Sequence, residues 1–341
     1  MSGTDGAAKA VIQADDLHVE YASSRKNTPG TKAVDGVSFS VHGGEIFGFL
    51  GPNGAGKTTT ISVLTTLLSP TSGRATVAGI DTVAAPAEVR RRIGLVFQTS
   101  TADAQLTGRE NLTLEAGLYG LRPSEVADRI DELLRQVELT AVADRLVGTY
   151  SGGMRRRLEL AAGLVHGPHI VFLDEPTLGL DPQGRAGFWK YIRELRDSKG
   201  ITVFLTTHYL DEADQLCDRI AIIDNGHIIA TGTPAELKDR MGGDTLEIGT
   251  AAGAADLTSA LGAIPGVSAV ARVDSGYRLK CARGEALVSK VVVAAQSGGV
   301  EITRLAVHKP SLDEVFLHLT GHAYREEGNG KAGATGAPGG R

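Results

Sequence analysis

The sequence predicts an α/β protein with a largely parallel sheet, a helical insert and a smaller C-terminal α+β unit. Short apolar runs alternate with helical stretches over residues 13–238, which is the pattern of a parallel sheet covered by helices. Residues 99–165 form a mostly helical subdomain within it. Over residues 243–322 the pattern reads strand, helix, strand, strand, helix, strand, helix. That order is compatible with a ferredoxin-like fold.

Length and composition exclude several classes of protein. A chain of 341 residues predicts about two domains and buries enough surface to fold without disulfides. Its two cysteines, Cys217 and Cys281, are too few for a zinc site or a disulfide framework, which fits a reducing compartment. The net charge of -5 argues against a nucleic-acid partner. No apolar run is long enough for a membrane span or a signal peptide, so we expect a soluble, cytosolic chain.

Local signals define the ends of several elements. Ser124 is predicted to cap a helix whose apolar face carries Val126 and Ile130. Ser311 and Glu314 have the spacing of a capping box at the last helix. Residues 323–341 are polar and rich in glycine, so this tail is expected to be disordered. Two arginine triplets, at 90–92 and 155–157, are interpreted as solvated helix faces.

A glycine-rich loop follows the apolar run 46–50. The stretch GPNGAGKTTT at 51–60 fits the pattern G-x-x-x-x-G-K-[ST] between a predicted strand and a predicted helix. Its backbone N–H groups and the helix N-terminus would bind phosphate, the lysine would reach the β- and γ-phosphates, and the next hydroxyl would face Mg²⁺. The alternative is a glycine-rich turn without a ligand. The predicted nucleotide contacts are Gly51, Pro52, Asn53, Gly54, Ala55, Gly56, Lys57, Thr58 and Thr59.

Two carboxylates follow a second apolar run, in IVFLDEP at 170–176. Four consecutive apolar residues predict a strand buried on both faces, so the acidic pair would lie at the carboxyl edge of the sheet, where ligands bind. Asp174 would hold Mg²⁺ through water, and Glu175 would orient the attacking water. The alternative interpretation is an acidic junction between a strand and a turn, without a ligand. The presence of the phosphate loop in the same chain argues against this alternative.

Two further segments can contact phosphate. Ser151, Gly152 and Gly153 precede a predicted helix and would form a second anion site at its N-terminus. His208 ends the β-rich run 201–208 and would lie at the same sheet edge as the carboxylates. A histidine in this position is more often structural, so it is only a candidate.

Together these motifs resemble the ATP-binding cassette (ABC) ATPases, which have the P-loop NTPase fold. The resemblance rests on GPNGAGKTT, LVFQTS, YSGGM, IVFLDEP, GLDP and LTTHYLDEAD in this order. It implies ATP and Mg²⁺ as cofactors. It also implies catalytic roles for Glu175, His208 and Gln98, and magnesium ligands at Thr58, Gln98 and Asp174. The signature motif would comprise Tyr150, Ser151, Gly152, Gly153 and Met154, with Asp181 between nucleotide sites and Tyr21 stacked on adenine.

The signature motif departs from the common LSGGQ at Tyr150 and Met154. With GMRRRLELAAGL at 153–164 and PSLDEVFLHLTG at 310–321, this variant is similar to the daunorubicin-resistance type of bacterial drug-export ATPase. The resemblance implies the ATP-hydrolysing subunit of an exporter, placed at the cytoplasmic face of the membrane. Its partners would be a separate integral membrane permease and a second copy of the chain in a nucleotide-sandwich dimer.

Other cassette proteins fit the sequence less well. Chromosome-structuring and DNA-repair ATPases carry heptad arms or zinc modules, and translation-factor cassettes usually carry two phosphate loops, whereas this chain has one. Glu175 argues against a purely regulatory nucleotide-binding module, because such a module needs no base. An importer ATPase remains open, since only the C-terminal similarity favours export.

Overall fold

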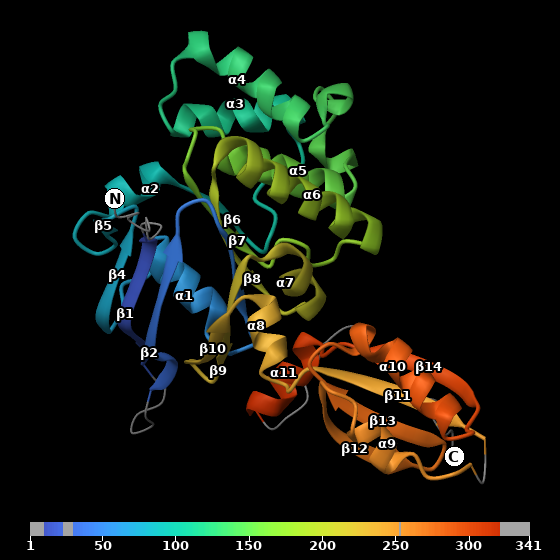
Figure 1. The fold of residues 1–341 in the computed structure, drawn as a ribbon. Helices are drawn as coiled ribbons and strands as arrows, with labels where there is room; N and C mark the ends of the chain where they lie inside the picture. The colour runs from blue at the N-terminus through green and yellow to red at the C-terminus, as the bar shows by residue number, and fades with distance from the viewer. Residues whose placement is uncertain (1–9, 23–29, 252–253, 321–341) are drawn as a thin grey trace, which may run out of the picture.

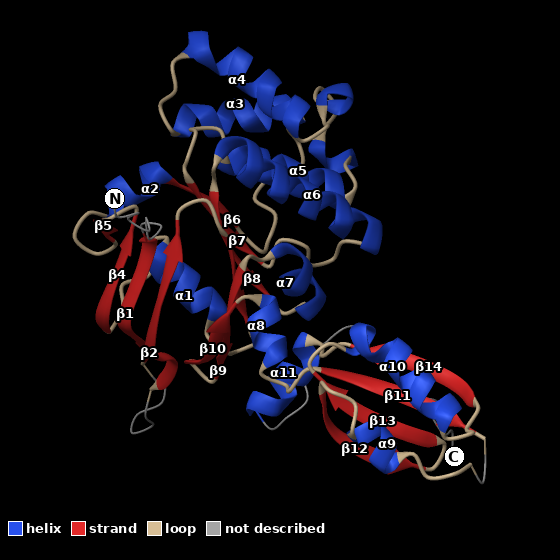
Figure 2. Cartoon of the chain, in the orientation of Figure 1, coloured by secondary structure: helices blue, strands red, loops and turns tan. Residues whose placement is uncertain are grey.

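The computed structural model of the chain describes residues 10–22, 30–251 and 254–320. Two sheets and their helices form one body, and a third sheet, orange to red in Figure 1, lies beside it near the C-terminus. Figure 2 shows the strands of each sheet and the helices around them. Within the described residues, no helix has both the length and the apolar character needed to cross a bilayer. The predicted disordered tail, 323–341, lies outside the described residues.

The central six-stranded sheet is mostly parallel, as predicted. Its strand order is β10-β9-β3-β8-β7-β6, and only the pairing of β9 with β10 is antiparallel. Three interior strands, β3, β7 and β8, are buried along their whole length, which explains their largely apolar sequence. The strands are β3 (Ile46–Leu50), β6 (Ile93–Val96), β7 (Ile170–Asp174), β8 (Thr202–Thr207), β9 (Arg219–Asp224) and β10 (His227–Gly232).

A second, antiparallel sheet packs over the first with α1 (Lys57–Leu64) between them. Phe39, Phe47 and Phe204 pack together with ring centroids 5.7–5.8 Å apart, and this cluster fixes β3 and β8 against β2. Each buried phenylalanine contributes about 1.5–3 kcal/mol to stability. The strand order is β2-β1-β4-β5. Its strands are β1 (Ala10–Tyr21), β2 (Thr31–His42), β4 (Ser72–Val77) and β5 (Ile80–Asp81), followed by α2 (Pro86–Arg92).

The helical subdomain lies beyond the edge strand β6, green in Figure 1. The predicted apolar face of its second helix is correct: Ile130, Leu133 and Leu134 are buried. The predicted cap is wrong, because the helix begins at Pro123, whose fixed φ suits the first helical position, and Ser124 lies inside the helix. The helices of the subdomain are α3 (Gly108–Leu118), α4 (Pro123–Gln136) and α5 (Gly152–Gly163), with 3-10 turns at Thr140–Val142 and Val147–Thr149. The next helix, α6 (Pro182–Lys199), follows β7 and packs against α5.

The C-terminal unit has the predicted order of elements. Its sheet order, β12-β13-β11-β14, is antiparallel throughout, and α9 and α10 share one core with it, as in a split βαβ fold. The other sheet face carries polar pairs such as Glu247 with Arg278. The elements are β11 (Asp244–Thr250), α9 (Thr258–Gly262), β12 (Val267–Val273), β13 (Gly276–Cys281), α10 (Gly284–Ser297) and β14 (Ile302–His308).

The last helix, α11 (Leu312–Thr320), returns to the first body. The Ser311 hydroxyl accepts a hydrogen bond from the Glu314 N–H at 3.2 Å, which is one half of the predicted capping box. Leu312 and Phe316 are buried in the core that also holds residues of α7 (Leu210–Leu216) and α8 (Pro234–Asp239). The C-terminal unit therefore contacts the helix that follows His208.

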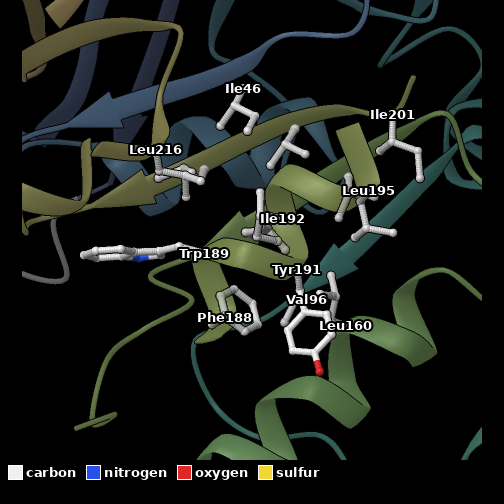
Figure 3. Close-up of a cluster of buried hydrophobic side chains, with 14 of the residues drawn as sticks. Ile46, Val96, Leu160, Phe188, Trp189, Tyr191, Ile192, Leu195, Ile201 and Leu216 are labelled. Carbon is white, nitrogen blue, oxygen red and sulfur yellow. The ribbon is translucent and has the colours of Figure 1, made fainter. Parts of the chain in front are cut away.

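The contact between α6 and α7 contains a buried carboxylate. Figure 3 shows the apolar side chains of α6 between α5 and the sheet, and Trp189 of α6 belongs to the same buried cluster as Leu216 of α7. The Trp189 indole donates to the Glu212 carboxylate at 2.9 Å, and Glu212 is fully buried. Burial raises the pKa of Glu212, since it disfavours the charged form.

Replacing Glu212 by Gln should change how stability depends on pH. Because its pKa is raised in the folded chain, the stability that protonated Glu212 contributes is present below its unfolded pKa and lost as pH rises through the folded pKa. The free energy of unfolding of Glu212→Gln relative to wild type should therefore increase as pH rises from the unfolded pKa of Glu212 toward its raised folded pKa. Chemical denaturation at several pH values measures it, with exposed Glu301→Gln as control. A pH-independent difference would contradict the prediction.

Candidate functional site

The site lies where three strands of the parallel sheet end. After β3 comes the loop to α1, after β7 comes Glu175, and after β8 comes His208. Parallel strands bring their carboxyl ends to one edge, where open α/β sheets bind ligands. The predicted residues from three distant segments are therefore side by side.

The loop at 51–56 has a backbone that requires glycine at two positions. Gly56 has φ +106°, and a Cβ there would lie 2.3 Å from the Ala33 carbonyl oxygen. A Cβ on Gly51 would lie 2.3 Å from the carbonyl oxygen of Ile223. A side chain at either position would push the loop away from the sheet, and α1 begins at the next residue, Lys57. The N-terminus of this helix thus faces the loop, as an anion site requires.

Lys57 is buried under the loop, with 5% of its surface exposed. Its Nζ donates to the carbonyl of Gly51 at 2.7 Å and to that of Pro52 at 3.2 Å. It also lies 3.3 Å from Glu175 Oε1. Burial lowers the pKa of Lys57, and the nearby Glu175 and Asp174 carboxylates oppose that shift.

Asp174, at the end of β7, is close to two hydroxyl groups. Its Oδ1 accepts from Thr206 Oγ1 at 2.6 Å and lies 3.4 Å from Thr58 Oγ1. Thr58 and Asp174 thus place hard oxygen donors together, which suits Mg²⁺. In the part of the chain that the structure describes, no group of three or more acidic, histidine or cysteine side chains could hold a metal. The residues fit an ion that takes only some of its ligands from the protein and the rest from phosphate and water, which is the usual arrangement for Mg²⁺.

The Glu175 carboxylate is surrounded by three of the predicted residues. Its Oε1 pairs with Lys57, while Oε2 lies 3.1 Å from His208 Nδ1 and 3.4 Å from Gln98 Nε2. Burial alone would raise the pKa of Glu175, but the contacts with His208 and Lys57 outweigh it and lower the pKa. At neutral pH the group is therefore an ionised carboxylate.

The backbone at Glu175 is also unusual. Its φ is +47°, the left-handed region that costs a residue with a side chain about 1–2 kcal/mol. The Glu175 N–H donates to the hydroxyl of Thr206 at 3.0 Å, which helps to hold this turn. Strained residues of this kind are concentrated at functional sites.

The signature residues lie in a different place from the phosphate loop. Ser151 caps α5 by accepting from Met154 N–H at 3.3 Å, and Asp181 caps α6 by accepting from Gly184 N–H at 2.7 Å. Both helix N-termini open on one cavity of about 620 Å³. Its described lining includes Ser151, Gly152, Gly153, Met154 and Asp181, and no residue of the loop 51–59.

Tyr150 and Tyr21, both predicted to contact the nucleotide, differ in burial: Tyr150 is buried and Tyr21 is exposed. The Tyr150 side chain is only 3% exposed and its hydroxyl donates to the Val142 carbonyl at 2.7 Å. It therefore packs into the core, and its side chain does not face the cavity. Tyr21, at the end of β1, is exposed, with its hydroxyl 3.4 Å from Thr59 Oγ1. It lies at the rim of the phosphate loop.

Sequence reasoning missed two residues here. Thr206, inside β8, holds both Asp174 and the turn at Glu175. The interpretation of residues 155–157 as a solvated face is wrong for Arg156, which is buried against Glu159. A sequence signal existed, because Glu159 is three residues further along α5 and one helical turn places the two side chains together.

Comparison with known proteins agrees with this geometry. A family described as ABC transporter matches residues 34–178, and one described as the C-terminal domain of DrrA1-3-like ATP-binding proteins matches residues 232–320. The daunorubicin resistance ATP-binding protein DrrA3 of Streptomyces coeruleorubidus is 47% identical, covering 90% of this chain and 96% of the relative. The linearmycin resistance ATP-binding protein LnrL of Bacillus subtilis is 38% identical, covering 89% and 99%.

Solved structures agree as well. A cassette in a dimeric post-hydrolysis state with ADP and Pi is 26% identical, with a TM-score of 0.59, covering 65% of this chain and 98% of that chain. CbiO1 of Clostridium perfringens is 28% identical, with a TM-score of 0.62, covering 68% and 92%. The resemblance inferred from the sequence is confirmed: this chain belongs to the ABC ATPases, among the ATP-binding proteins of the daunorubicin-resistance type.

Proposed function

We propose that this chain is the ATP-hydrolysing subunit of an exporter that moves a drug or antibiotic-like compound through a separate integral membrane permease. The observation that carries the proposal is the convergence of Lys57, Gln98, Asp174, Glu175 and His208 at one sheet edge. The names of the relatives, which include daunorubicin and linearmycin resistance and Nod factor export, support the direction of transport.

ATP binding would exchange the contacts of Lys57. Its ammonium group now lies between loop carbonyls and Glu175. A triphosphate on the loop N–H groups carries more negative charge than one carboxylate and would draw Lys57 to its β- and γ-phosphates. Thr58, Gln98 and Asp174 would hold Mg²⁺, which neutralises charge on the phosphates when bound. Tyr21 would lie against the adenine ring.

Hydrolysis would depend on the freed Glu175 carboxylate. An ionised carboxylate beside the terminal phosphate can orient and polarise a water molecule for in-line attack. His208 and Gln98 already contact its Oε2. Because the terminal phosphate would lie beside this carboxylate, each of the two residues could contact the phosphate as well. In phosphoryl transfer the protein mainly positions groups and stabilises charge, and these residues supply both functions.

A second copy of the chain would complete each nucleotide site. The signature residues and Asp181 open on a cavity separate from the phosphate loop, so one chain does not bring its own two anion sites together. A head-to-tail dimer would place ATP between one chain's loop and the other's Ser151, Gly152 and Gly153. The related cassettes solved as dimers support this arrangement.

The permease would contact α3. Leu114 and Leu118 are exposed one helical turn apart, and Leu118 has 74% of its surface accessible. The neighbouring Tyr119 is also exposed, whereas Leu121 packs against the core. The exposed pair suits an apolar partner at the cytoplasmic face of the membrane. Residues 13–238 would form the ATPase unit, with the helical subdomain at 99–165, and residues 243–322 an accessory unit.

Replacing Lys57 by Ala should abolish tight ATP binding. The change removes the buried cation that would face the β- and γ-phosphates, and it leaves Glu175 without its ion pair. Calorimetric titration with MgATP measures the loss, and the exposed Lys290→Ala is the control of equal charge. Unchanged affinity in Lys57→Ala would refute the assignment of the phosphate loop.

Replacing Glu175 by Gln should retain ATP binding and slow hydrolysis by at least ~10², as loss of one transition-state group commonly does. Because bound ATP holds the dimer shut, the variant should accumulate as a dimer with MgATP. Phosphate release and size-exclusion chromatography measure the two effects, with Glu301→Gln as control. Wild-type turnover in the variant would show that Glu175 is not the base.

A photo-crosslinking residue in place of Tyr119 should capture an integral membrane protein from membranes of the source cells. Leu118→Asp in the same chain should lower the yield, because a charge would be buried in an apolar contact. Mass spectrometry identifies the product, and a crosslinker at the exposed Val293 of α10 is the control. Capture of soluble proteins alone would count against the α3 contact.

A further inference from the structure

Arg156 is the buried member of an arginine triplet on α5. Its exposed fraction is 7%, whereas Arg155 before it is exposed and Arg157 is half-buried. It lies five residues beyond Ser151, the cap of the same helix. A charged side chain is rarely buried unless its hydrogen bonds are satisfied, so its partners indicate its role.

The guanidinium group has five N–H donors, and the structure gives it five acceptors. Nε donates to the Pro176 carbonyl at 2.7 Å, and Nη2 donates to those of Asp174 and Glu175 at 3.1 and 3.3 Å. Nη1 donates to the Phe97 carbonyl at 2.5 Å and to Glu159 Oε2 at 2.8 Å. One carboxylate balances the charge, and four backbone carbonyls use the remaining donors.

These carbonyls belong to the two segments that carry the predicted chemistry. Asp174, Glu175 and Pro176 form the turn that ends β7, where Glu175 has its left-handed backbone. Phe97 directly precedes Gln98. Thr206 holds the turn through the Glu175 N–H, and Arg156 holds it through three successive carbonyls. The side chain therefore joins α5 to both segments.

We infer that Arg156 is a positioning residue that couples the signature motif to Glu175 of the same chain, through the turn itself and through Gln98, which contacts the Glu175 carboxylate. α5 is a rigid element, so a shift of Ser151 against the second copy's nucleotide moves Arg156 with it. Through its hydrogen bonds, the guanidinium then moves the turn at Glu175 and the segment before Gln98 in the same direction. Closure of the signature motif over one nucleotide thus aligns Glu175, the base, at the other nucleotide site of the dimer. This inference rests on the proposed function, because it takes Glu175 as the base.

The geometry requires arginine. Lysine keeps the charge, but its single nitrogen has three donors that diverge from one point, whereas the guanidinium presents five in a plane. A lysine at this position would leave carbonyls of the turn without donors. Glutamine removes the charge, has two donors and leaves Glu159 unpaired. Both substitutions should disturb the turn, with lysine the milder.

The test compares Arg156→Gln and Arg156→Lys with Arg129→Gln. Arg129 is a matched control, because it also donates to two backbone carbonyls, Leu164 and Val165, and to a carboxylate three residues on, Glu132. In ATPase assays below the thermal midpoint, Arg156→Gln should lower kcat at least ~10-fold, as sub-ångström misplacement of catalytic groups can, with KM for ATP within about threefold. Arg156→Lys should be intermediate, and Arg129→Gln should keep its kcat.

A second arm uses the Glu175→Gln background. If Arg156 acts through Glu175, adding Arg156→Gln there should change the residual rate less than about threefold, because residues that act as a unit are not additive. If the rate reductions of Glu175→Gln and Arg156→Gln multiplied in full in the double variant, the inference would be overturned. So would a kcat in both Arg156 variants equal to that of Arg129→Gln. If Arg156→Gln does not fold, Arg156→Lys takes its place both in the kcat comparison with Arg129→Gln and in the double variant with Glu175→Gln.

The two proposals can fail separately. Wild-type hydrolysis by Glu175→Gln alone would refute the proposed base and, with it, the coupling. Slow hydrolysis by Glu175→Gln combined with normal kcat in the Arg156 variants would refute only the coupling.

Discussion

The carboxylate of Glu175 is the meeting point of three segments that lie far apart in the sequence. Lys57 follows β3, Gln98 follows β6, and His208 follows β8, yet all three contact the carboxylate that follows β7. The parallel sheet makes this possible, since it brings the carboxyl ends of its strands to one edge. Because Lys57 and His208 favour the ionised form, the pKa of Glu175 is lowered despite burial. The charge needed to orient water is thus present before any nucleotide binds.

Backbone contacts extend this arrangement to the rest of the fold. Thr206 and Arg156 both hold the turn at Glu175, the first from β8 and the second from α5. α7, which follows His208, packs against α6 through the Trp189 indole and Glu212, and against α11 of the C-terminal segment. Buried polar contacts at Glu175 and Glu212 and the apolar contact with α11 therefore join these elements.

Much of the site could be predicted because its motifs are local. A glycine-rich loop, an acidic pair and a histidine each follow an apolar strand, and strand ends of a parallel sheet converge. The contacts of Arg156 could not be predicted, because an arginine triplet is usually solvated and only the tertiary fold shows which member is buried. Tyr150 was expected at the nucleotide, but its neighbours bury it. The Ser124 cap failed because Pro123 competes for the helix start.

The most direct test is a structure of the wild-type chain with Mg²⁺ and a non-hydrolysable ATP analogue. We expect the Lys57 ammonium group to leave Glu175 and bind the β- and γ-phosphates, with Glu175 facing the terminal phosphate and a second copy's Ser151 opposite. A nucleotide bound elsewhere, with the Lys57–Glu175 pair intact at its present 3.3 Å, would contradict the account.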